Sequence, residues 1–160
     1  MIRVVTFLLC ISSLTAVAQQ PYVIPKPLGL VSDYENIFTG TQETKLTRLV
    51  ARYEKKTTVQ IAVATIDTSM VIQPQFDGYT LAVANNWGVG QKERNNGVVI
   101  ALSKGYRQIR IQNGLGIEKY LTDERTKFII DNDMIPHYKR GNYYKGTRRG
   151  LKALMKQITR

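Results

Sequence analysis

The sequence predicts an α/β protein in which helices cover both faces of a sheet. Residues 98–102 form a continuously apolar run, which is typical of a strand buried on both sides. Apolar residues recur at helical spacing both before and after this run. The predicted order of elements is helix, strand, helix, hairpin, helix, helix. We therefore expect a three-layer α/β/α sandwich with a mixed central sheet flanked by about four helices.

The N-terminus has the form of a secretory signal peptide. Arg3 precedes a mostly apolar run over residues 4–14, and Ala16-Val17-Ala18 supplies an A-x-A cleavage site. The apolar run is too short to span a bilayer, and no second run of that kind follows. Residues 1–18 are therefore predicted to be removed. We expect an exported protein, periplasmic or secreted, with no transmembrane helix in the mature chain.

The mature chain is predicted to hold an arm and one domain. Residues 19–30 contain three prolines, which favour an extended arm over a helix or strand. Residues 31–160 are long enough to bury one sizeable core. A short strand is expected near Val31, at the start of this domain.

The first helix and the first long strand follow in order. Thr39 and Gln42 have the spacing of a capping box, which predicts a helix start. Apolar residues at i, i+3, i+4 and i+7 extend this helix to about Lys56. Residues 59–65 are rich in β-branched side chains and predict a covered strand.

A second helix and a hairpin occupy the middle of the chain. Apolar residues at helical spacing run from Phe76 to Trp87, and Gly88 ends the pattern. Trp87 is interpreted as a core residue. Residues 98–102 and 108–111 then form two strands joined by a tight turn that contains a glycine.

The last third of the domain is predicted to be helical. Thr122 is placed as an N-cap, and residues 128–130 are predicted to form the buried side of the helix that follows. That helix is expected to fray at residues 131–133. Gly141-Asn142 then caps a final helix with a regular apolar stripe.

The final helix also carries a basic face. Its members follow the helical period, rotated away from the apolar stripe. We call this set the basic strip: Lys145, Arg148, Arg149, Lys152 and Lys156. It is either a solvated face or a docking surface for an anionic partner.

Polar loops at the two ends of the hairpin form the candidate binding site. In an antiparallel pair, the segment that enters the first strand and the segment that leaves the second lie at one edge of the sheet. This places Asn95, Asn96, Glu118 and Asp123 near one another. Oxygen donors gathered on loops are typical of sites for hard cations such as Ca²⁺ or Mg²⁺. The alternative is an ordinary cluster of turn residues.

Composition and motifs exclude several functions. The net charge of +11 points first to anionic partners, which in an exported protein are envelope components or proteins rather than nucleic acid, and it is also compatible with simple solubility. The only cysteine, Cys10, lies in the signal peptide, and His137 is the only histidine, so ordinary zinc sites are not expected. Residues 114–119 fail the dinucleotide-binding pattern because Lys119 replaces its third glycine.

Several segments in order resemble the TPM domain. They include NNWGVG over residues 85–90, NNGVVIAL over 95–102, RIQNGLGIEKYLTDE over 110–124 and IPHYKRGNYYKG over 135–146. The resemblance covers residues 31–158. It implies an α/β/α sandwich, usually outside the cytoplasm. Thylakoid-lumen members of this family are linked to a calcium-associated acid phosphatase activity, and bacterial members resemble metal-binding domains.

The resemblance also implies particular ligands. Carried across to this sequence, the metal ligands are Asp33, Glu118 and Asp123, together with Asn95 and Asn96 before the first hairpin strand. More acidic relatives carry aspartate at one or both of the last two positions. Because asparagine brings no charge, calcium binding is expected to be weaker here.

Three functions remain open from the sequence. The favoured one is a divalent-cation-binding accessory or interaction module of the cell envelope. The second is a weak metal-dependent phosphatase, and the third is a metal-free structural domain that binds a partner. The sequence does not predict catalytic residues or an oligomeric state.

Overall fold

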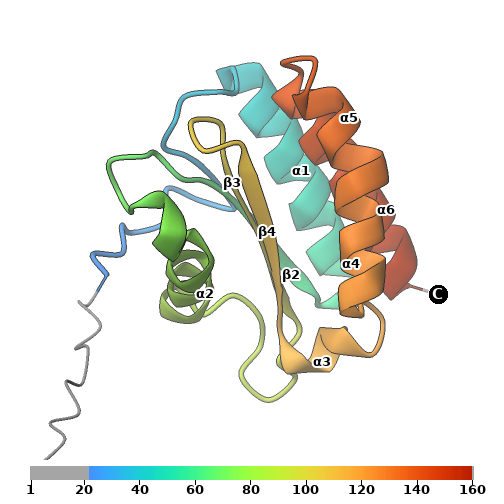
Figure 1. Cartoon of the computed structure of the whole chain (residues 1–160). Coiled ribbons are helices and arrows are strands. Elements are labelled where there is room, and N and C mark those ends of the chain that lie inside the picture. The colour runs from blue at the N-terminus through green and yellow to red at the C-terminus, as the bar shows by residue number, and fades with distance from the viewer. Residues whose placement is uncertain (1–21, 160) are drawn as a thin grey trace, which may run out of the picture.

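The computed structural model describes residues 22–159, which fold around one four-stranded sheet (Figure 1). The strands are β1 (Val31–Asp33), β2 (Gln60–Thr65), β3 (Gly97–Ser103) and β4 (Gln108–Asn113), in that spatial order. β1, β2 and β3 are parallel, and β4 returns antiparallel to β3. The predicted mixed sheet and the short first strand are therefore confirmed.

β3 is the centre of the sheet, and all seven of its residues are buried. Its side chains alternate between two apolar clusters. Ile100 belongs to the larger cluster, on the face covered by α1 and α6, whereas Ala101 belongs to the smaller cluster, under α2. The fully apolar sequence of β3 follows from this burial on both faces.

Two long helices cover the larger cluster. α1 (Gly40–Thr57) begins at the predicted capping box, in which Thr39 and Gln42 each bond the other's main-chain N–H. α6 (Tyr143–Ile158) begins at Asn142, whose side chain accepts a hydrogen bond from the N–H of Lys145. Both predicted starts are confirmed, and the two helices lie side by side on one face of the sheet (Figure 1).

The opposite face is covered by α2 (Phe76–Trp87), which follows a short 3₁₀ turn, η1 (Gln73–Gln75). The arm over residues 22–30 contains neither helix nor strand and runs against this helix. The Tyr22 and Tyr79 rings meet edge to face at 5.4 Å, and the indole N–H of Trp87 donates to the carbonyl of Pro25 at 2.8 Å. Trp87 is therefore a packing residue that also anchors the arm.

The connection between β4 and α6 differs from the prediction. It consists of α3 (Leu115–Glu118), α4 (Asp123–Ile129), a π-helical segment η2 (Ile130–Met134) and α5 (Ile135–Tyr138). The segment expected to fray is therefore helical throughout.

Packing of Met134 explains why this segment stays ordered. Met134 is fully buried, and a Cβ atom built at Gly150 of α6 would lie only 2.5 Å from its sulfur. The glycine thus allows the close contact that holds η2 against α6. Phe128, predicted to be buried, is 65% exposed, because Thr126 and Ile129 form the inner side of α4.

The predicted signal peptide lies outside the described residues. Among the helices of residues 22–159, none combines the length and the apolar character needed to cross a bilayer.

Candidate functional site

The hairpin brings its two flanking segments together at the end of the sheet where β3 begins and β4 stops, as the sequence predicted. The N–H of Gly114 donates to the carbonyl of Gly97 at 2.9 Å, and the N–H of Gly116 donates to the carbonyl of Asn95 at 3.0 Å. A Cβ atom at Gly116 would lie 2.0 Å from the carbonyl oxygen of Arg94. The main chains therefore approach so closely that only glycine fits at this position.

The side chain of Asn96 makes hydrogen bonds that hold this end of the sheet together. It is 6% exposed; its Oδ1 accepts from the N–H of Gln91 at 2.8 Å, and its Nδ2 donates to the carbonyl of Thr58 at 2.9 Å. Thr58 is the left-handed residue that ends α1, with φ of 65°. Asn96 thus ties the loop before β3 to the end of α1 and points its oxygen at a main-chain donor.

The other predicted donors at this end of the sheet are exposed. Asn95, Glu118 and Asp123 are all exposed to solvent, and their side chains make no hydrogen bond to any other residue within 22–159. Glu118 ends the short α3, and Asp123 begins α4 at its N-terminus. The structure therefore brings their segments to one end of the molecule but does not join their side chains.

Asp33 lies at the opposite end of the sheet, where the parallel strands stop. It ends β1, which runs parallel to β3, whereas Asn96 precedes β3. Its two carboxylate oxygens accept from the N–H of Phe38 and the hydroxyl of Thr65, both at 2.7 Å. The grouping of Asp33 with Asn96 and Glu118 is therefore corrected: Asp33 secures the turn after β1. The sequence carries a signal for this separation, because strands connected through a helix run parallel. The end of β1 and the start of β3 therefore lie at opposite ends of the sheet.

The five predicted ligands do not fit one metal site. Within residues 22–159, no group of three or more Asp, Glu, His or Cys side chains is placed to hold a metal ion. Binding of Ca²⁺ or Mg²⁺ therefore stays a prediction. It now depends on Asn95, Glu118 and Asp123, without Asp33 and with Asn96 already engaged.

A pocket of about 270 Å³ opens at the end of the sheet that holds Asn96, between the ends of α1 and α6. Its lining combines the apolar Val59, Ile117 and Ile158 with the cationic Arg94 and Lys119. The guanidinium of Arg94 donates to the hydroxyl of Thr58 at 2.7 Å. Because helix C-termini carry partial negative charge, Arg94 offsets the end of α1, and Lys119 adds a second positive charge to the lining. They also oppose a divalent cation in this pocket. Sequence reasoning missed both residues, because isolated basic residues in loops carry no distinctive pattern.

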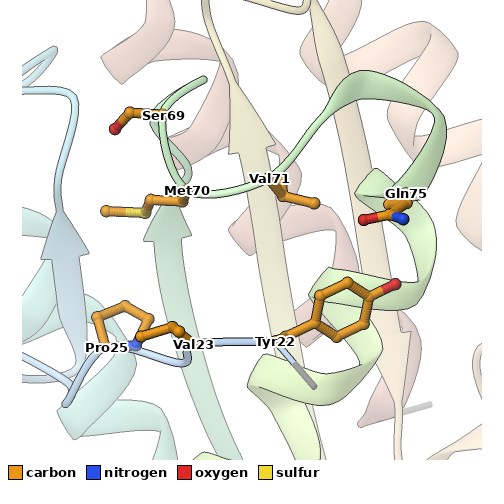
Figure 2. Close-up of a pocket in the computed structure, with 7 residues that line it drawn as sticks. All are labelled: Tyr22, Val23, Pro25, Ser69, Met70, Val71 and Gln75. Carbon is orange, nitrogen blue, oxygen red and sulfur yellow. The ribbon is translucent and has the colours of Figure 1, made fainter. Parts of the chain in front are cut away.

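A second pocket, of about 460 Å³, lies between the arm and the loop that connects β2 to α2 (Figure 2). Tyr22, Val23 and Pro25 border it on the arm, and Met70 and Val71 border it on the loop. No carboxylate, histidine, lysine or arginine lines it. This lining offers packing surface, with the Tyr22 phenol, the Ser69 hydroxyl and the Gln75 amide as its polar side chains.

His137 is not part of a catalytic arrangement within the described chain. Its ring contacts the guanidinium of Arg140 at 3.5 Å, and no carboxylate is bonded to it. Partial desolvation lowers the pKa of His137, and the positive charges of Lys145, Arg140 and Arg149 lower it further. The lowered pKa of His137 thus reflects, in part, the positive charges near the start of α6.

The basic strip is exposed along its full length. All five side chains face solvent: Lys145, Arg148, Arg149, Lys152 and Lys156. Of these five side chains, only Arg149 pairs with an acid of residues 22–159, at 3.1 Å from Asp133. At about 1.5 Å per residue, the strip extends for roughly 17 Å.

Comparisons with known proteins identify the family. The sequence pattern of the TPM domain matches residues 31–157. The solution structure of the N-terminal domain of a protein from P. gingivalis has 32% identity and a TM-score of 0.72, covering 81% of each chain. The BA42 protein of the psychrophilic bacterium Bizionia argentinensis has 22% identity and a TM-score of 0.67, covering 79% of this chain and 84% of its own.

A third solved structure has the same fold. The N-terminal domain of a Corynebacterium glutamicum protein has 18% identity and a TM-score of 0.58, covering 87% of this chain and 85% of its own. No curated protein matches the chain. The family match spans most of the sequence, and the predicted α/β/α sandwich is confirmed. This chain belongs to the TPM domain family.

Proposed function

We propose that this TPM domain is a non-enzymatic accessory module that binds an anionic surface of the cell envelope through the basic strip on α6. The observation that carries the proposal is the exposure of all five cations along one face of one helix. Export to the envelope is part of the proposal and comes from the sequence of residues 1–18.

The charged residues in and around α6 are almost all positive. Residues 134–160 contain eight Lys and Arg and no Asp or Glu. Asp133 lies just before this segment and neutralises only Arg149. A cation near an anionic membrane contributes about 1 kcal/mol of attraction, so four unpaired cations give useful affinity without a deep pocket.

The strip favours attachment to a surface over insertion into it. The apolar side of α6, including Leu151 and Leu154, is fully buried against the sheet. No large apolar side chain of α6 is exposed beside the cations. Binding is therefore expected to be electrostatic and to weaken as salt shortens the screening length, which is about 8 Å at physiological ionic strength.

A charge-reversal experiment tests the proposal. The variant K145E/R148E/K152E removes three cations and spares the Arg149–Asp133 pair. The matched control, K26E/K92E/K104E, changes the net charge equally at exposed positions outside α6. Sedimentation with phosphatidylglycerol vesicles should show a loss of about tenfold or more in affinity for the first variant and a smaller loss for the control.

Two results would reject the proposal. If both variants lose affinity equally, net charge rather than the strip governs binding. If the unchanged protein binds phosphatidylglycerol and phosphatidylcholine vesicles alike, the attraction is not electrostatic.

A further inference from the structure

The free edge of β4 is the feature that neither the family nor the basic strip explains. Among residues 22–159, β4 is the last strand of the sheet and pairs on one side only, with β3 (Figure 1). The opposite edge strand, β1, is three residues long, which leaves little main chain to pair. β4 has six residues without proline. Natural sheets usually blunt an edge of that length.

The hydrogen-bond register shows which groups face outward. Gly97 and Gly114 are directly opposed and bonded, so the pairs 99/112, 101/110 and 103/108 are the bonded ones along the hairpin. The N–H and C=O groups of Ile109 and Ile111 therefore point away from β3. Within residues 22–159, no other strand pairs with them.

The two faces of this edge differ in chemistry. The Ile109 and Ile111 side chains pack into the larger apolar cluster. On the other face, Arg110 pairs with Asp77 of α2, and Gln112 donates to the hydroxyl of Thr80 at 3.0 Å. A strand added here would have apolar residues continuing the cluster on one face and polar residues beside Arg110 on the other.

We propose that the β4 edge binds an extended peptide of a partner protein, by addition of a strand in which apolar and acidic residues alternate. An extended peptide satisfies the outward main-chain groups of Ile109 and Ile111, and its alternation matches the two faces. Acidic residues suit the net charge of +11.

A second copy of the chain fits this edge less well. Of the symmetric antiparallel pairings, the one centred on Arg110 would place the two Arg110 side chains opposite each other, whereas those centred on Ile109 or Ile111 would place Arg110 opposite Gln108 or Gln112. Like charges directly opposed across strands are destabilising. Two chains of net charge +11 also repel at longer range.

Amide hydrogen exchange measured by NMR tests the proposal. The probe is a capped peptide of about eight residues in which valine and glutamate alternate. Without peptide, the Ile109 and Ile111 amides should exchange faster than those of Arg110 and Gln112, which face β3. Millimolar peptide should slow exchange at Ile109 and Ile111 by about tenfold or more. The same peptide N-methylated at its valines should have no effect, because valines that lie opposite Ile109 and Ile111 turn their N–H groups toward β4.

A proline variant gives an independent readout. Proline is tolerated where a strand N–H faces away from its neighbour, so I109P should keep the fold and lose the peptide effect at Ile111. Unchanged exchange at Ile109 and Ile111 with millimolar peptide would overturn the proposal, as would full peptide binding by folded I109P.

The test also separates this proposal from its rivals. Protection of Ile109 and Ile111 that rises with protein concentration in the absence of peptide would assign the edge to a second copy and overturn the peptide proposal. The K145E/R148E/K152E variant should keep the peptide effect, so failure of vesicle binding and failure of strand addition are distinguishable.

Discussion

Substitution of Asn96 separates a structural role from metal ligation. Asn96→Asp keeps an oxygen that can accept from the N–H of Gln91, but it replaces the donor Nδ2 by an oxygen facing the Thr58 carbonyl. Two acceptors then oppose each other in a site where the residue is 6% exposed. Asn96→Ala removes both bonds and leaves their partners unsatisfied.

The expected cost follows from these contacts. These two part-buried hydrogen bonds contribute about 1 kcal/mol each, and unsatisfied partners add to the loss, so Asn96→Ala should lower the free energy of unfolding by about 2–3 kcal/mol. For a domain of this size, each kcal/mol lowers the Tm by about 3–4 °C, which gives a shift of roughly 6–12 °C. Asn96→Asp should cost at least as much at neutral pH.

The pH dependence of Asn96→Asp carries the sharper test. The protonated carboxyl can donate to the Thr58 carbonyl, so folding should raise the pKa of the introduced aspartate above its ordinary value. A raised carboxyl pKa means that the folded state binds the extra proton, and stability is lost as pH rises through that pKa. Urea unfolding followed by circular dichroism should therefore show the variant approaching the unsubstituted protein at acidic pH.

The opposite result would refute this reasoning. If Asn96→Asp matches the unsubstituted protein in stability at neutral pH, the amide does not hold the loop. If calcium then stabilises the variant strongly, Asn96 acts as a ligand position and the sequence prediction for it is correct.

Three further predictions concern charge and burial elsewhere. Lys145→Glu should raise the pKa of His137, because it removes one of the positive charges that lower it; NMR titration of the imidazole checks this, and an unchanged pKa would contradict it. Since the folded pKa of His137 is lowered, its contribution to stability should be lost as pH falls through the ordinary histidine range, near about 6.5, and Lys145→Glu should reduce that loss. Asp33→Ala should lower the free energy of unfolding by about 2–4 kcal/mol in chemical denaturation, because it leaves two buried donors without an acceptor. An unchanged free energy of unfolding would show that the turn after β1 does not depend on these two hydrogen bonds. Calcium at about 10 mM should shift the amide signals of Glu118 and Asp123 if the weak site predicted from the sequence exists, and unmoved signals would reject it.

Local signals in the sequence determined the elements and their ends. The Thr39–Gln42 capping box, the caps at Thr122 and Asn142 and the stop at Gly88 all lie where the pattern predicted. These features depend on main-chain groups within one helical turn, so neighbouring residues suffice to predict them. The hairpin register likewise followed from a short turn, and it placed Asn95 beside Gly116.

Only the tertiary structure decided what the polar side chains do. A sequence shows that Asn96 and Asp33 stand at strand ends, but their partners, Thr58 and Thr65, come from other elements. Phe128 was misplaced for a similar reason, since the face of α4 that is buried depends on how α4 packs against α6 and η2. A carboxylate or amide is a ligand or a structural link according to which donors the fold delivers to it, and those donors are distant in the chain. The sequence thus determined the scaffold and its family, whereas packing determined which candidate ligands remain free.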